Sequence, residues 1–194
     1  MPYGTFSVCV YCGARDGNDP DYATAAEATG ALFAARSWRL VYGAGDVGLM
    51  GRVARAAQAG GGPTLGVIPR HLMDLEVGKT DLDSLIVTET MHERKKVMLM
   101  NADAIVALPG GAGTLDELLE ALTWRQLGLH EKPIYLLNTN DYWSILIDLL
   151  IGLTTHGFAG PELVAMLRVV PTPEALGEAL AAVAPAGGRA VGPA

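Results

Sequence analysis

Cysteine and histidine, the side chains that most often bind metals or carry redox chemistry, are scarce in this chain, which has two cysteines and four histidines in 194 residues. Cys9 and Cys12 lie in or directly after the first apolar run, and no second cysteine or histidine cluster completes a metal or redox site. We therefore expect both to be buried, reduced thiols, as in a reducing cytoplasm. The histidines lack metal-ligand spacing, so the sequence predicts no metal site.

Long apolar runs and export signals are also absent. The longest apolar run near the C-terminus, residues 145–153, is interrupted by Asp148 and is too short to span a bilayer. No basic segment followed by an apolar stretch stands at the N-terminus, so no signal peptide is visible. These absences predict a cytoplasmic protein without a membrane partner.

Basic residues are outnumbered, with 14 lysines and arginines against 21 aspartates and glutamates, a net charge of −7 and a pI near 5.0. This balance argues against a nucleic acid as the main partner, although a small anion can still bind at a helix terminus. Half of the residues are hydrophobic, enough to bury the core of one domain. We assign residues 1–184 to a single nucleotide-binding domain and expect the Pro/Gly/Ala-rich tail, 185–194, to be disordered.

Short β-branched strands alternate with helical segments along the chain. We expect strands near 6–11, 39–42, 64–68, 85–87, 104–108, 133–137 and 167–170, and helices near 20–36, 47–59, 90–101, 114–127, 141–151 and 172–183. This alternation predicts an α/β fold, a doubly wound (Rossmann-like) parallel sheet with helices on both faces. Ligands of such folds bind at the carboxyl ends of the strands, where three glycine-containing strand ends would meet, at 13, 43–48 and 110–113.

The glycine-rich stretch after residues 104–108 is the strongest candidate for a ligand site. Gly110, Gly111 and Gly113 let a ligand approach the main chain, and a helix beginning near Thr114 would offer free N–H groups to a phosphate. The loop has no lysine, so it does not match the Walker pattern of triphosphate hydrolysis. The alternative is that these glycines only make a tight strand-to-helix turn.

Residues 43–48 match the Gly-x-Gly-x-x-Gly fingerprint of dinucleotide-binding proteins. The fingerprint also requires an acid near the end of the next strand, where this chain has Ile68, Pro69 and Arg70. A dinucleotide oxidoreductase is therefore the weaker interpretation, and glycines for tight turning and close helix packing are the stronger one. No Gly-x-Ser-x-Gly elbow is present to support serine hydrolase chemistry.

Glu117 and Arg94 are charged residues near the expected cleft, and each has two interpretations. Thr114 and Glu117 have capping-box spacing, as do Thr90 and Glu93, so the Glu117 carboxylate could simply reach back to its own helix start. Arg94 could be a solvated helix charge. Because the two residues follow neighbouring strand–helix turns, an acid–base or charge-stabilising pair across one cleft is the functional alternative.

Four segments together resemble the Lonely Guy family of cytokinin riboside 5′-monophosphate phosphoribohydrolases, whose members are often mislabelled as lysine decarboxylases. They are Tyr42 to Gly51, Met91-His-Glu-Arg-Lys95, Pro109-Gly-Gly-Ala-Gly-Thr-Leu-Asp-Glu117 and Thr123-Trp-Arg-Gln-Leu-Gly128, and the resemblance spans residues 6–160. Two departures are visible: Ala44 stands where many members have glycine, and Asp116 where many have glutamate. We expect Ala44 to alter the pocket wall.

The resemblance implies hydrolysis of the N-glycosidic bond of AMP or an N6-prenylated AMP, giving the free base and ribose 5-phosphate. It implies no cofactor, and nothing marks one of the four lysines as a Schiff-base partner for pyridoxal phosphate. Arg94 and Glu117 correspond to the catalytic pair, and the substrate contacts to Glu76, Arg94, Lys95, Gly110, Gly111, Ala112, Gly113, Thr114, Leu115, Asp116, Glu117 and Thr123.

Two further expectations come with the resemblance. Family members are usually homodimers, and the apolar helix expected at 141–151 is a candidate contact surface. The alternative to an enzyme is a non-catalytic nucleotide- or molybdenum-cofactor-binding module of the same fold, and intact Arg94 and Glu117 favour the enzyme.

Overall fold

A parallel sheet of seven strands organises the chain in a computed structural model, which describes residues 5–73 and 81–185. The strands are β1 (Ser7–Tyr11), β2 (Arg39–Tyr42), β3 (Thr64–Pro69), β4 (Ser84–Thr88), β5 (Ala104–Ala107), β6 (Ile134–Leu137) and β7 (Leu167–Val170). Their order across the sheet is β4-β3-β2-β1-β5-β6-β7, and every pairing is parallel. The predicted doubly wound α/β fold is confirmed.

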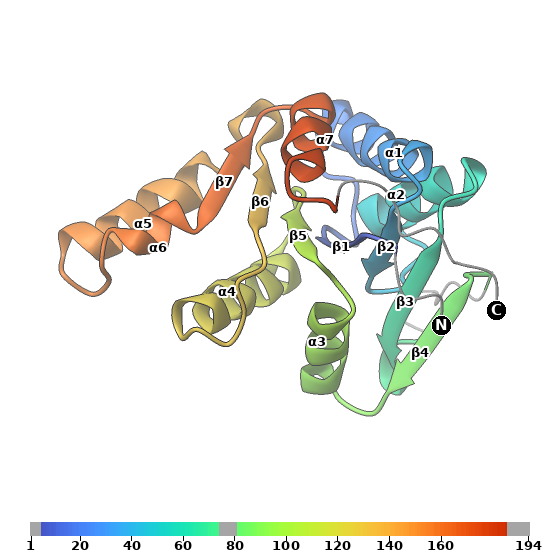
Figure 1. Ribbon diagram of the computed structural model, residues 1–194, viewed down its shortest axis with the longest axis horizontal. Helices are drawn as coiled ribbons and strands as arrows, with labels where there is room; N and C mark the ends of the chain where they lie inside the picture. Colours follow the sequence, from blue (N-terminus) through green and yellow to red (C-terminus); the bar gives the residue numbers. More distant parts are fainter. Residues whose placement is uncertain (1–4, 74–80, 186–194) are drawn as a thin grey trace.

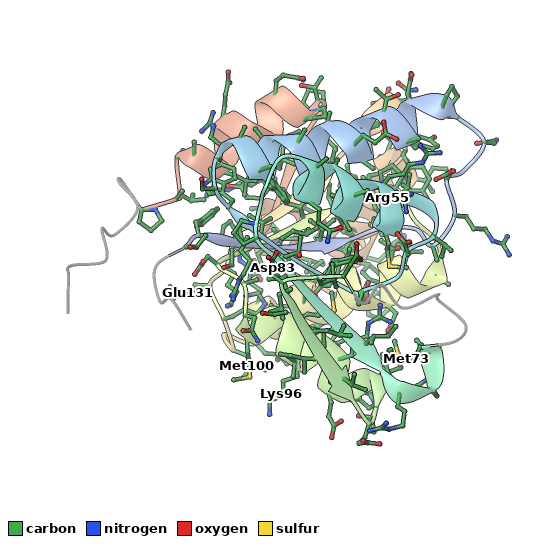
Figure 2. All side chains as sticks on the ribbon, turned by 90° about the vertical axis from the view of Figure 1, so that its right-hand side faces the viewer. Arg55, Met73, Asp83, Lys96, Met100 and Glu131 are labelled. Carbon is green, nitrogen blue, oxygen red and sulfur yellow. The ribbon has the colours of Figure 1, made fainter. Side chains whose placement is uncertain are left out.

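Helices cover both faces of this sheet (Figure 1). One face carries α1 (Pro20–Ala35), α2 (Gly48–Ala59) and α7 (Pro173–Ala181), and the other carries α3 (Met91–Met100), α4 (Ala112–Gln126), α5 (Ser144–Thr155) and α6 (Glu162–Ala165). Figure 2 shows these layers from the side, with Arg55 of α2 on one side of the sheet and Lys96 and Met100 of α3 on the other. No helix in the described ranges is long and apolar enough to cross a membrane.

Side chains of the central strands alternate between two hydrophobic cores. Val8 and Val10 of β1 join the core beneath α1, α2 and α7, whereas Cys9 and Tyr11 join the core beneath α3, α4 and α5. All residues of β1 are therefore buried. A strand covered on both faces reads as a continuous apolar run, which is why the sequence locates these strands well.

The order of the strands reverses between β1 and β5. The chain adds β2 to β4 on one side of β1 and β5 to β7 on the other, so the connections after β1 and β5 leave in opposite directions. Such a reversal opens a crevice at the carboxyl ends of the two strands. The residues that follow them are bonded to one another, since the Gly13 N–H donates to the Pro109 carbonyl at 3.0 Å.

The helices differ from prediction at three places. α4 begins at Ala112 rather than near Thr114, and α5 begins at Ser144, after the short 3₁₀ turn η2 (Thr139–Asp141). α6 was not expected, because four residues are too few to show helical periodicity. A second 3₁₀ turn, η1 (Arg70–Leu72), lies in a segment for which we expect neither a strand nor a helix. Beyond Pro185, the predicted tail lies outside the described residues.

Candidate functional site

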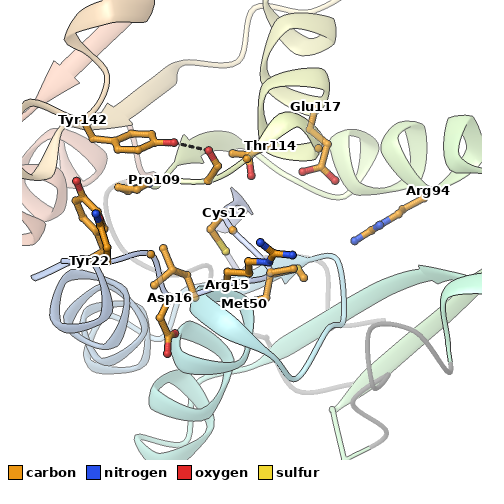
Figure 3. Close-up of a pocket in the computed structure, with 18 of the residues that line it drawn as sticks. Cys12, Arg15, Asp16, Tyr22, Met50, Arg94, Pro109, Thr114, Glu117 and Tyr142 are labelled. Atoms are coloured by element: carbon orange, nitrogen blue, oxygen red, sulfur yellow. Dashed lines mark hydrogen bonds between the residues drawn. The ribbon is translucent and has the colours of Figure 1, made fainter. Parts of the chain in front are cut away.

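A pocket of about 520 Å³ opens at the carboxyl ends of β1 and β5, where the strand order reverses. Its wall comes from the residues after β1, the first turns of α2 and α3, the glycine loop at 109–113 and the start of α4 (Figure 3). This volume suits a small molecule, since such sites span roughly 300–1,000 Å³. The pocket lies at the sheet edge where the sequence predicts a ligand.

The glycine loop packs tightly on one side and is open on the other. A Cβ atom at Gly110 would lie 2.1 Å from Oγ1 of Thr114 and 2.8 Å from the nitrogen of Gly13, so a larger residue does not fit there. A Cβ atom at Gly111 or Gly113 would meet nothing within 4 Å, so a ligand can approach the backbone. Gly111 is the N-cap of α4 and makes no side-chain cap, which leaves N–H groups of the first turn for a ligand.

The capping-box interpretation of Thr114 and Glu117 is excluded, because α4 begins at Ala112 with Gly111 as its N-cap. Thr114 therefore lies inside the first turn, where it is buried. Asp116 and Glu117 lie in the second turn, and the first turn holds no acidic residue. Glu117 is left to line the pocket instead of capping its own helix.

Arg94 is 3% exposed, so its interpretation as a solvated helix charge is excluded. α3 starts with the predicted capping box, in which Thr90 accepts from the Glu93 N–H and Glu93 accepts from the Thr90 N–H. With the helix start fixed, Nη2 of Arg94 donates to the Gly43 carbonyl at 3.1 Å. A Cβ atom at Gly43 would lie 1.8 Å from that nitrogen, so the glycine after β2 makes room for the guanidinium.

Glu117 and Arg94 reach the pocket from different helices, and Figure 3 shows the carboxylate and the guanidinium extending into the same region. Burial raises the pKa of the Cys12 thiol in the pocket wall, and the negative charge of Glu117 raises this pKa further against the opposing effect of Arg94. Cys12 is therefore a neutral thiol, not a nucleophilic thiolate. Cys9 and Cys12 are both free and buried, as predicted.

Lys95 and Asp116 pair with each other beside the pocket. Nζ of Lys95 lies 3.0 Å from a carboxylate oxygen of Asp116 and 3.0 Å from one of Glu120. Burial lowers the pKa of Lys95, but the hydrogen bonds to these two carboxylates outweigh burial and raise it. Neither Lys95 nor Asp116 lines the pocket among the described residues. The ion pairs join α3 to α4, the two helices that carry Arg94 and Glu117.

The other members of the predicted binding set lie in different places. The Thr123 hydroxyl donates to the Leu119 carbonyl on the exposed side of α4, at 2.7 Å. Ala112 and Leu115 belong to the first turn of α4 but are not part of the pocket wall that the described residues form. Glu76 lies outside the described residues.

Several pocket residues have no counterpart among the residues singled out from the sequence, among them Arg15, Tyr22 and Tyr142. Gly13 follows β1 and marks the loop that carries Arg15, so the sequence contained a pattern that could have identified Arg15. Tyr22 of α1 and Tyr142 after η2 reach the pocket through packing, and no motif marks them.

Residues 43–48 pack closely against neighbouring segments. They are not part of the pocket wall that the described residues form. A Cβ atom at Gly48, whose φ is +55°, would lie 2.3 Å from the backbone of Ala14 and Arg15. Ala44 has a φ of 60° and lies against Gly66 of β3, away from the pocket wall that it was expected to alter. Close packing, the stronger interpretation of this motif, is what the structure contains.

Comparison with known proteins agrees with the motifs. A family model described as "Possible lysine decarboxylase" matches residues 50–180. The cytokinin riboside 5′-monophosphate phosphoribohydrolase LOG7 of Arabidopsis thaliana is 44% identical over 168 residues, which cover 87% of this chain and 76% of the relative. The probable cytokinin riboside 5′-monophosphate phosphoribohydrolase LOGL2 of Oryza sativa subsp. japonica is 42% identical over 178 residues, covering 92% and 73%.

Among solved structures, the molybdenum cofactor binding protein from Rippkaea orientalis is similar, with a TM-score of 0.70 and 21% identity over 93% of this chain and 98% of that chain. At this identity the likeness shows the fold alone. The family is shown by the sequence relatives, which are far more similar and cover most of the chain. The chain therefore belongs to the Lonely Guy family of cytokinin riboside 5′-monophosphate phosphoribohydrolases, as its motifs predict.

Proposed function

We propose that this protein hydrolyses the N-glycosidic bond of adenine-type nucleoside 5′-monophosphates, AMP or its N6-prenylated forms. The products are the free base and ribose 5-phosphate. The observation that supports this best is the meeting of Glu117, Arg94 and an uncapped, glycine-rich helix start in one pocket. The relatives, which are named for activity on cytokinin riboside 5′-monophosphates, support the same class of substrate.

The 5′-phosphate binds at the start of α4 in this proposal. Gly110, Gly111, Gly113 and Thr114 line the pocket there, and the N–H groups and dipole of the helix favour an anion. Arg15 adds a cation to the same pocket. The chain as a whole carries a net charge of −7, so the attraction for a phosphate is local.

Glu117 acts on the ribose. Cleavage passes through an oxocarbenium-like ribose, which a nearby carboxylate stabilises. The bond between C1′ and the base nitrogen breaks, while water supplies a hydroxyl group to C1′ and a proton to the departing base. Arg94, held by the Gly43 carbonyl, orients Glu117 and the phosphate or the leaving group.

The remaining substrate contacts are proposed from the family motifs alone. They are Glu76, Lys95, Ala112, Leu115, Asp116 and Thr123. The Lys95–Asp116 ion pair is compatible with a supporting role, because it ties α3 to α4, the helices that carry Arg94 and Glu117.

A homodimer in the cytoplasm is also part of the proposal. Exposed apolar side chains on α5 support the dimer, and two free buried thiols fit a reducing compartment. No cofactor, nucleic acid or membrane partner is invoked.

Lysine decarboxylation, which the description of the family model suggests, has no support in the pocket. None of the lysines in the described ranges lines it. Lys95 is bonded to two carboxylates, and Lys132 donates to the Ala102 carbonyl. A Schiff-base lysine needs an amine that the substrate can reach.

Incubation with AMP and with isopentenyl-AMP tests the proposal. We expect equal amounts of free base and ribose 5-phosphate from each nucleotide, with the ratio of the two kcat/KM values reporting the preference for a prenyl group. Adenosine, which lacks the phosphate anchor, should have a kcat/KM lower by roughly 100-fold or more. Tight nucleotide binding without release of base would contradict hydrolysis and favour the alternative, a non-catalytic nucleotide- or molybdenum-cofactor-binding module.

A further inference from the structure

Tyr142 reaches the glycine loop from a distant part of the chain. It follows η2 and lines the pocket, where its hydroxyl donates to the carbonyl oxygen of Gly110 (Figure 3). Its ring makes edge contacts with Tyr22, at 5.6 Å between centroids, and with Trp143, at 5.0 Å. Trp143 is buried, so the ring of Tyr142 is fixed by a contact with the core as well as by the hydrogen bond in the pocket.

The turn that presents Tyr142 is held in a conformation that non-glycine residues rarely adopt. Asn140 has a φ of 50° and Asp141 a φ of 57°. Nδ2 of Asn140 lies 2.8 Å from a carboxylate oxygen of Asp19 and 3.0 Å from one of Asp21, at the start of α1. Backbone strain of this kind persists only where surrounding contacts fix it, and it concentrates at functional positions.

The hydrogen bond from Tyr142 determines which way the next peptide group faces. In a planar trans peptide, the carbonyl of Gly110 and the N–H of Gly111 point in opposite directions. With the carbonyl held toward Tyr142, the Gly111 N–H is turned away from the phenol, at the N-cap of α4. Because both residues are glycine, this peptide could otherwise rotate with little steric cost. A rotated peptide would present a carbonyl oxygen, which repels a phosphate, in place of the N–H.

We propose that Tyr142 is a positioning residue that keeps the Gly110–Gly111 peptide oriented for phosphate binding. This inference rests on the proposed function for the identity of the substrate, but the loop geometry that carries it is independent of the reaction. Tyr142 therefore determines affinity for the phosphate end of the nucleotide and leaves affinity for the base unchanged.

Tyr142→Phe tests this role, because it keeps the ring and removes only the hydroxyl. We expect the dissociation constant for ribose 5-phosphate, measured by calorimetry, to rise by about 10-fold, and that for adenine to stay within about twofold. The KM for AMP should rise by a similar factor while kcat changes by less than about threefold. Tyr135→Phe is the matched control, since Tyr135 also donates to a backbone carbonyl, that of Ala179, in the core outside the pocket.

Two results would overturn the inference: unchanged ribose 5-phosphate affinity in Tyr142→Phe, or equal weakening of ribose 5-phosphate and adenine, which indicates a general loss of structure. Failure of the proposed function looks different. If the wild type does not release base from AMP, binding of inorganic phosphate to the wild type and Tyr142→Phe still measures the orientation of the peptide. Weaker phosphate binding in the variant then supports the positioning role of Tyr142 even though the protein does not hydrolyse AMP.

Discussion

Gly43 is the residue on which the position of Arg94 depends. Its missing side chain leaves room for the guanidinium, and its carbonyl accepts the hydrogen bond that holds the guanidinium in place. A methyl group there collides with the flexible end of Arg94 and not with backbone, so Arg94 can move and the fold can remain.

Gly43→Ala should therefore separate activity from stability. We expect kcat/KM for AMP to fall by roughly 100-fold, because a small displacement of a positioning group is costly. The free energy of unfolding should fall by no more than about 1–2 kcal/mol. Gly152→Ala in α5 is the control, since a Cβ atom there meets nothing within 4 Å. Full activity in Gly43→Ala would show that Arg94 does not need this position.

Two capping-box patterns in the sequence have different outcomes for a physical reason. Thr90 and Glu93 form the box because Thr90 is the N-cap of α3. The same spacing at Thr114 and Glu117 forms none, because Gly111 already starts α4 and Thr114 is buried against Gly110. The spacing of the threonine and the glutamate does not show which residue is the N-cap. In α4, the N-cap is determined by the packing of the glycine loop against the end of β1.

The connection between α4 and β6 contains a histidine whose protonation state is coupled to folding. Nδ1 of His130 accepts the Lys132 N–H at 3.2 Å, so the neutral ring carries its proton on Nε2, which lies 2.9 Å from the Ala121 carbonyl. A second proton on Nδ1 would break the bond to Lys132. Burial lowers the pKa of His130, against the hydrogen bond to Ala121, which raises it.

This lowered pKa gives a stability prediction with a definite sign. The unfolded chain takes up the proton at a higher pH than the folded chain, so stability is complete above the ordinary histidine pKa and decreases as the pH falls toward the folded pKa. We expect the free energy of unfolding to decline from neutral pH to about pH 5, and His130→Gln to weaken that decline. His156→Gln, at an exposed histidine, is the control. The same pH dependence in His130→Gln would contradict the assignment.

Elements are predicted well where local sequence is enough to define them. β1, β5 and β6 are buried along their whole length and appear in the sequence as short apolar runs. The start of α5 was misplaced because η2 precedes it with two left-handed residues, Asn140 and Asp141, neither of which is glycine. The contacts of Asn140 with Asp19 and Asp21 join positions that are far apart in the sequence and have no local pattern.

The pocket is assembled from loops that no single sequence motif connects. The sequence indicates that the glycine-containing strand ends share one edge, and the reversal between β1 and β5 places two of them in one pocket. The sequence does not indicate that Tyr142, which follows β6 in the chain, contacts the glycine loop. That contact depends on how α5 and η2 pack.

The surface of the molecule supports the proposed dimer. Only Leu150 of α5 is buried, while Ile145 is 83% exposed, Leu149 is 60% exposed and Phe158, after the helix, is 83% exposed. Apolar side chains gathered on one helix are typical of a protein interface. Figure 1 shows α5 extending from the edge of the sheet, beside β7 and α6.

We expect light scattering to give twice the chain mass of 20.3 kDa for the wild type, and a monomer for Leu149→Arg, which buries a charge in the interface. Ala31→Arg adds the same charge to an exposed position of α1, on the opposite face of the sheet, and should remain a dimer. A monomeric wild type would contradict the dimer and leave the pocket residues unaffected.

Glu117 acts chemically on the ribose in the proposed reaction, and release of base from AMP by Glu117→Gln measures that role. The substitution keeps the shape of the side chain and removes the charge, and Glu117 is not needed as a cap. We expect kcat to fall by roughly 100- to 10,000-fold in a variant that still unfolds in one cooperative transition. Glu178→Gln, the same change at an exposed position of α7, should keep full activity. Wild-type kcat in Glu117→Gln would exclude a chemical role for this carboxylate.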